Sequence, residues 1–170
     1  HYARRHLMKL GLKDPDVRDM MFKLLADRDA YQRREVLKAL EDQNIETEDS
    51  RYLEGLLTRK ADDLRRGVLS LLTNQPDEAA LASADRLTGA RKLEQRTAGL
   101  ELLQLLVKKE RAVTDCRARA AQYQEAHGDL SEAEKNLVRS IVDTETVLTL
   151  EDALGLMDPS RRSEEHTSEL

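Results

Sequence analysis

Residues 61–72 read ADDLRRGVLSLL, which is the pattern of a short amphipathic helix. Apolar residues recur every three or four positions, and this spacing places side chains on one face of an α-helix. They are Leu64, Val68, Leu69, Leu71 and Leu72. Asp62 or Asp63 is placed to cap the start, because a short carboxylate can accept from the free N–H groups of a first turn. We therefore predict a helix that begins at these aspartates and buries its leucines.

The same pattern occurs twice more in the chain. Residues 33–40 read RREVLKAL and residues 96–103 read RTAGLELL, and both align with RRGVLSLL at residues 65–72. The copies begin 32 and 31 residues apart, with a weaker copy at residues 4–10. Their common core is an arginine, three residues, a leucine, one residue, an apolar residue and a leucine. This regular spacing indicates an internal repeat.

A second helical pattern precedes each copy, at residues 17–25, 52–57 and 79–87. The repeating unit is thus a pair of helices, and a pair this small cannot bury its own apolar stripe. Stacked pairs share a continuous core. We therefore predict an all-α fold, an α-solenoid of about three to four helical hairpins in a right-handed stack. Residues 110–127 and 131–142 are predicted as a fourth, irregular pair, joined without a break to the helix that follows Arg96.

Residues 29–40 and 62–72 each combine an aspartate-containing turn with a helix that opens with arginine, and this arrangement resembles a HEAT-like repeat of the compact bacterial kind. The resemblance covers roughly residues 1–108 and implies a solenoid that binds other macromolecules. Residues 149–161, TLEDALGLMDPSR, together with RKADDLRRGVLSLL at residues 59–72, resemble the helical region of large bacterial MolR-like proteins. That second resemblance implies no settled activity.

Composition and the two ends of the chain set further expectations. Of the 170 residues, 36% are charged and 3% aromatic, and Cys116 is the only cysteine, so no internal disulfide is possible. Short apolar runs and the lack of a signal peptide predict a cytoplasmic protein that does not enter the membrane. Residues 1–142 are predicted to be the repeats, and residues 143–161 a loop and short helix leading to a missing C-terminal region. Residues 162–170, RSEEHTSEL, resemble a translated sequencing adapter, so we expect a fragment of a longer protein with an unpacked tail.

The candidate site residues are the arginines that recur in each repeat. They are Arg33, Arg34, Arg65, Arg66 and Arg96. In a solenoid such positions form a ladder, which can either bind phosphates or pair with carboxylates of neighbouring turns. The candidate carboxylates are Asp29, Asp62, Asp63 and Glu94. The net charge of −5 and the absence of interleaved aromatic residues favour structural pairing.

Other residues give little sign of chemistry. The histidines are His1, His6, His127 and His166. They form no metal-binding motif, and Cys116 has neighbouring arginines that could lower its pKa but no nearby histidine to act as a base. We therefore expect no catalytic residue, metal or cofactor.

The predicted function is a scaffold module that is not an enzyme and that binds a protein or the remainder of its own chain. The alternatives are a nucleic-acid-binding HEAT-like module, or an accessory region of an enzyme whose catalytic domain is missing.

Overall fold

The computed structural model describes residues 11–143, which are helical and contain no strand. The elements are η1 (Gly11–Lys13), α2 (Pro15–Leu25), α3 (Ala30–Leu40), α4 (Thr47–Leu56), α5 (Asp62–Thr73), α6 (Asp77–Thr88), α7 (Leu93–Lys108), α8 (Val113–Ala126) and α9 (Glu132–Val142). The predicted all-α class is therefore confirmed for this part of the chain. The weak copy at residues 4–10, the short helix predicted within 144–161 and the adapter-like tail at 162–170 lie outside the described residues.

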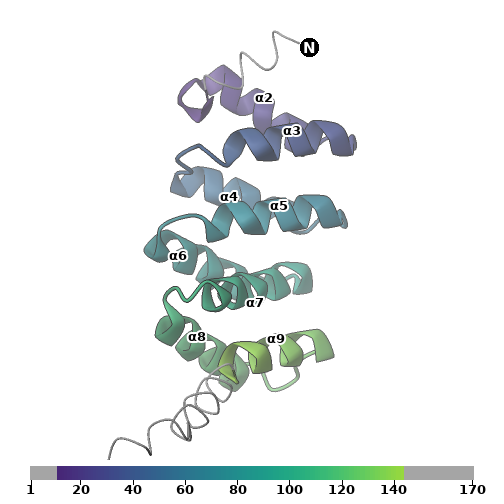
Figure 1. Ribbon diagram of the computed structural model, residues 1–170. Helices are drawn as coiled ribbons and strands as arrows, with labels where there is room; N and C mark the ends of the chain where they lie inside the picture. The colour runs from purple at the N-terminus through teal and green to yellow at the C-terminus, as the bar shows by residue number, and fades with distance from the viewer. Residues whose placement is uncertain (1–10, 144–170) are drawn as a thin grey trace, which may run out of the picture.

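Consecutive helices pack in pairs, α2 with α3, α4 with α5, α6 with α7 and α8 with α9. The second helices of the pairs contact one another in the order α3, α5, α7, α9, and the first helices α4, α6 and α8 do the same. Figure 1 shows the pairs following one another along a single axis, from α2 at one end to α9 at the other. A surface made from successive second helices therefore runs the length of the described chain.

Helix starts agree with the sequence in two places and differ in two. The Asp14 side chain caps α2 with Pro15 in the first turn, and Ser131 begins α9 with a capping box that it forms with Glu134. In contrast, Ala61 occupies the capping position of α5, so the predicted aspartate cap is wrong. Both aspartates lie within the first turn, where their charge still favours the positive end of the helix dipole. Helix α4 also begins earlier than expected, at Thr47, because the sequence pattern indicated a helix only over residues 52–57.

The junction between α7 and α8 is a tight turn that the sequence did not predict. Glu110 and Ala112 adopt left-handed backbone conformations, with φ of 56° and 44°, although neither is glycine. Such residues cost on the order of 1 kcal/mol each. Arg111 holds the turn against the preceding pair: its guanidinium donates to the carbonyl oxygens of Thr73 and Gln75 and contacts the carboxylate of Asp77. The predicted continuous helix is therefore interrupted by a contact with a distant part of the chain.

The predicted leucines form the core. The side chains of the α5 stripe are all buried, and they belong to one apolar cluster that reaches from Val17 to Ile141. The repeat position shared by Leu69 and Leu100 is buried in both copies, at 4% and 0% exposed. Gly89 ends α6 with a φ of −80°, so this glycine is not in the left-handed conformation that often follows a helix.

Helices α6 and α7 approach closely at Gly99. A Cβ atom at this position would lie 2.8 Å from the backbone nitrogen of Thr88 and 2.9 Å from Cβ of Leu87. Real Cβ atoms do not approach backbone this closely, so a side chain here would separate the two helices. Glycine is therefore required by packing, since its φ is not in the left-handed region.

We expect Gly99→Ala to lower the free energy of unfolding by about 1–3 kcal/mol, the usual cost of overpacking a tight core. Gly55→Ala in α4 is the matched control, because no atom lies within 4 Å of the Cβ it would add. That variant should gain up to about 1 kcal/mol from the higher helix propensity of alanine. Urea denaturation followed by circular dichroism measures both. Equal effects at the two positions would contradict the close approach of α6 and α7.

Candidate functional site: the arginine–carboxylate pairs between helices

Three of the five candidate arginines occupy the same place in successive second helices. Arg33, Arg65 and Arg96 are each the fourth residue of their helix, in α3, α5 and α7. Each guanidinium reaches a carboxylate on the next second helix: Arg33 pairs with Asp63, Arg65 with Glu101, and Arg96 with Glu134. The partners are separated by 30, 36 and 38 residues. We call these pairs the second-helix series.

Arg33 is the most enclosed member of the second-helix series, with 8% of its surface exposed. Its Nε and Nη2 donate to the two carboxylate oxygens of Asp63, at 3.0 and 2.9 Å. Its Nη1 donates to the carbonyl oxygens of Asp27 and Arg28, in the turn that precedes α3. One side chain therefore joins its own hairpin turn to the following pair of helices, and charge-assisted, two-pronged bonds of this kind fix relative orientation.

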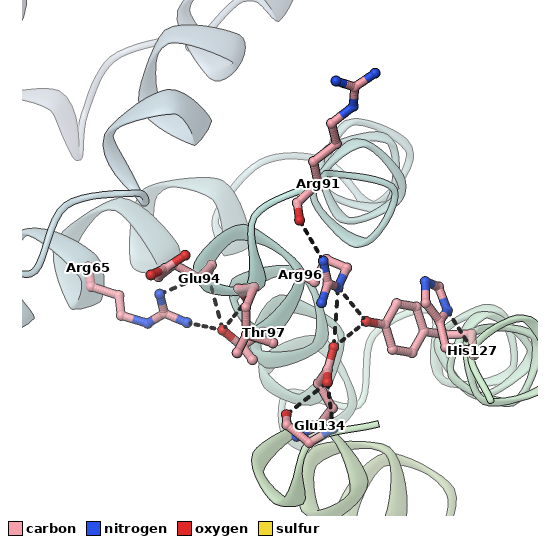
Figure 2. Close-up of polar contacts among 10 residues, drawn as sticks. Arg65, Arg91, Glu94, Arg96, Thr97, His127 and Glu134 are labelled. Carbon is pink, nitrogen blue, oxygen red and sulfur yellow. Dashed lines mark hydrogen bonds and ion pairs between the residues drawn. The ribbon is translucent and has the colours of Figure 1, made fainter. Parts of the chain in front are cut away.

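Arg65 makes the equivalent contact one pair later. Its Nε and Nη2 donate to the two oxygens of Glu101 at 3.2 and 3.0 Å. The remaining hydrogen bonds go to the Glu94 carbonyl oxygen and the Thr97 hydroxyl, both near the start of α7 (Figure 2). Every nitrogen of this guanidinium is engaged by α7.

The last member of the second-helix series lies in a buried polar cluster. The Nε of Arg96 donates to the Tyr123 hydroxyl at 3.1 Å and to Glu134 at 3.3 Å, and Nη1 donates to the Arg91 carbonyl oxygen. Figure 2 shows Arg96 and Glu134 pointing toward one another, with His127 to the right of both. The His127 ring stacks on Tyr123 with centroids 4.1 Å apart. The cluster joins α7, α8 and α9.

Glu134 is only 2% exposed, yet it is held as a carboxylate. Burial, the largest influence, opposes ionisation, but hydrogen bonds from Tyr123, Ser131 and Arg96 outweigh it and lower the pKa of Glu134 to about 2. Burial and then the hydrogen bond to Glu134 raise the pKa of Tyr123 to about 12. Both groups therefore keep one protonation state near neutral pH, as expected of structural groups rather than proton-transfer catalysts.

Most carboxylates that the arginines reach are not the candidates named from the sequence. Of the four candidate carboxylates, Asp63 accepts from an arginine side chain, and Glu94 contributes only its backbone carbonyl. Asp29 instead accepts from the backbone N–H of Tyr31 at the start of α3. The true partners of the later arginines, Glu101 and Glu134, lie on the following pair of helices and not in the adjoining turn. That distance along the chain is why local reasoning missed them.

A parallel set of pairs joins the first helices and was not predicted. Arg18 of α2 contacts Asp49 of α4 at 2.6 Å. Glu54 of α4 accepts from Arg86 of α6, and Asp85 of α6 accepts from Arg119 of α8, at 2.7 and 2.8 Å. These opposite charges are 31 to 34 residues apart, which is close to the repeat length. A search for opposite charges at that spacing would have found this first-helix series.

The two remaining candidate arginines are placed differently. Arg34 and Arg66 follow Arg33 and Arg65 in sequence, and both are exposed. Neither side chain has a hydrogen-bond or ion-pair partner among the described residues. The candidate ladder therefore divides into an inner set that is paired and an outer set that faces solvent.

An open groove of about 390 Å³ lies between α5 and α7, beside Arg66. Its lining residues are Arg66, Leu69, Ser70, Thr73, Glu101, Gln104, Leu105 and Lys109. We call this cavity the α5–α7 groove. Leucine side chains form its floor, and polar and charged side chains surround them.

Three further features can be signs of function: the cysteine, a metal site and a membrane-spanning helix. Cys116 is buried in the core, and burial raises the pKa of its thiol to about 11 although Arg119 and Arg111 act to lower it. Within residues 11–143, no three His, Cys, Asp or Glu side chains are grouped as metal ligands. No helix in this range has the length and apolar character needed to cross a membrane.

The described chain is all-helical, and ion pairs join each pair of helices to the next. The family whose model matches the chain is described as a family of unknown function (DUF5724), and the match covers residues 1–170. The chain belongs to this family. No curated protein and no solved structure matches it.

The buried cluster gives a pH prediction. Because the pKa of Glu134 is lowered from 4.5 to about 2, its charged form stabilises the fold above pH 4.5, and this contribution is lost as the pH falls toward 2. We expect Glu134→Gln to reduce the free energy of unfolding at pH 7 by about 3 kcal/mol, with the difference from the unaltered protein shrinking through this range. Urea denaturation at a series of pH values measures it.

Glu132→Gln is the control for this experiment. Glu132 is on the same helix, and its side chain is exposed and contacts only Lys135 in the described chain. Its removal should change stability by less than about 0.5 kcal/mol at any pH in the series. A pH-independent loss in Glu134→Gln would mean that the carboxylate charge is not what stabilises the cluster.

Proposed function

We propose that this chain is a non-catalytic scaffold module, a HEAT-like α-solenoid that binds a protein partner or the remainder of its own chain. The proposal places it in a larger cytoplasmic bacterial protein, with the repeats spanning residues 1–142 and a linking segment following them. Support comes from the order of helix contacts and from the recurrence of Arg33, Arg65 and Arg96 at one helix position. The resemblance of the sequence to HEAT-like repeats points in the same direction.

The observation that carries the proposal is the complete engagement of the inner arginines. Each member of the second-helix series is bound to a carboxylate and to at least one further oxygen of the protein. A phosphate group could displace these contacts only by leaving a carboxylate unpaired, which is costly when that carboxylate is buried as Glu134 is. Arginines that are paired in this way stabilise the packing of the helices and are not available to a ligand. An array of helices with an open groove suits binding of a partner by surface complementarity.

The alternative proposal, a nucleic-acid-binding module, is favoured by one observation. Arg34 and Arg66 are exposed at equivalent positions of adjacent second helices, where a phosphate backbone could meet both. Against it, the whole chain carries a net charge of −5. Among the described residues, the exposed aromatic side chains are Tyr31 and Tyr52, and the Tyr52 ring already stacks on Phe22. Few surfaces for base stacking therefore accompany these cations.

Adjacent residues provide the test. Arg65→Ala removes a paired guanidinium and should lower the free energy of unfolding by about 1.5–3 kcal/mol, the value of hydrogen bonds to a charged group. Arg66→Ala removes an exposed neighbour and should change it by less than about 0.5 kcal/mol. Thermal melts of both variants, with a titration of duplex DNA at two salt concentrations, decide between the proposals. On the scaffold proposal, DNA binding is negligible at physiological salt in all three proteins.

The opposite result is equally specific. Salt-sensitive DNA binding that is lost in Arg66→Ala at unchanged stability would support the nucleic-acid alternative, with the salt slope falling by about one for the lost phosphate contact. A neutral Arg65→Ala variant would show that the second-helix series does not hold the framework together.

A further inference from the structure

We propose that the α5–α7 groove binds an amphipathic helix that presents leucine-type side chains between two acidic residues. This inference rests on the proposed scaffold function and names the site and the chemistry of the partner. Three features of the groove carry it: its floor, the charges at its two ends, and the kind of backbone that forms its walls.

The floor of the groove is apolar and concave. Leu69 of α5 is 4% exposed at its base, and Leu105 of α7 is partly buried beside it. A cavity of about 390 Å³ is large enough for two or three aliphatic side chains. The hydrophobic effect favours covering such a surface, and a polar rim around it is typical of a recognition site.

The charged side chains that line the groove carry an excess of positive charge. Its carboxylate, Glu101, is neutralised by Arg65 from the second-helix series. Arg66 has no described partner, and Lys109 donates only to the neutral side chain of Asn74. The groove therefore carries a positive excess within a chain whose net charge is −5, and charge complementarity selects an acidic partner.

The two cations mark opposite ends of the groove. Arg66 lies in the second turn of α5, whereas the Lys109 ammonium is held at Asn74, the residue that ends α5. Eight residues of α-helix separate these points, which corresponds to about 12 Å along the axis. Acidic residues seven or eight positions apart on a partner helix have the same separation, with apolar residues between them on the same face.

The helices that form the walls of the groove determine which backbone conformation suits a partner. Both walls are α-helices, whose mid-helix N–H and carbonyl groups are already hydrogen-bonded. They present no sheet edge to which an extended peptide could add. A helix satisfies its own backbone and interacts through side chains alone, so it suits this groove better than an extended peptide or a single-stranded nucleic acid.

The experiment uses a synthetic probe and the full chain. The probe is a fluorescein-labelled peptide of about 18 residues, long enough to form a helix by itself. Its glutamates are eight positions apart, leucines occupy the same face between them, and alanine and glutamine fill the rest. Fluorescence anisotropy should show saturable binding, and replacing the leucines with glutamine should abolish it.

Variants of the chain locate the site. The double variant Arg66→Glu with Lys109→Glu should weaken probe binding by about tenfold or more, and it should bind a probe with lysines in place of glutamates better than the unaltered chain does. Arg34→Glu is the control, because it reverses one arginine charge at the position of α3 equivalent to Arg66, outside the groove. That variant should bind as the unaltered chain does. Thermal melts of the unaltered chain, the double variant and Arg34→Glu verify that all three proteins are folded.

Three results would overturn the inference. Lack of saturation at about 1 mM probe, or an equal loss in Arg34→Glu, would remove the groove as the site and leave the scaffold proposal standing. Displacement of the probe by duplex DNA, with the DNA binding itself lost in the double variant, would assign the groove to nucleic acid. That third result would contradict the scaffold proposal as well.

Discussion

The structure depends on a single kind of contact, an arginine on one helix bound to a carboxylate on the corresponding helix of the next pair. Burial of leucine favours association of the helices but does not specify their angle or offset, because the hydrophobic effect is non-directional. A two-pronged guanidinium–carboxylate bond does specify them. Once a carboxylate such as Glu134 is buried, loss of its arginine would leave an uncompensated charge, so the geometry that keeps the pair together is strongly favoured over its alternatives.

The two series of pairs act on different sides of the helix stack. The second-helix series runs through α3, α5, α7 and α9, and the first-helix series through α2, α4, α6 and α8. Two lines of fixed contacts, one on each side, define a plane and therefore the direction in which successive pairs can turn. Gly99 adds a steric limit of its own, since it sets how close α6 and α7 come at one point along this path.

Sequence reasoning succeeded where the signal is periodic and failed where it comes from distant residues. The stripe from Leu64 to Leu72 is a local pattern, and the structure buries it as predicted. The turn at Glu110 and Ala112 contains no glycine or proline, and it exists because Arg111 bonds to a loop more than thirty residues earlier. The carboxylate partners were missed for the same reason, and the exposure of Arg66 could be read only from the folded chain.

The pairs also determine how the molecule carries mechanical load. Each ion pair joins a helix to the corresponding helix of the next pair, so within each series a pull between the two ends passes through the ion pairs one after another. Elements loaded in series share the same tension, and the weakest link yields first. The exposed pair of Asp85 with Arg119 is less protected from water and salt than the pair at Glu134, so extension would begin between α6 and α8 on one side while α7 and α9 stay joined on the other. The stack would then bend before it came apart.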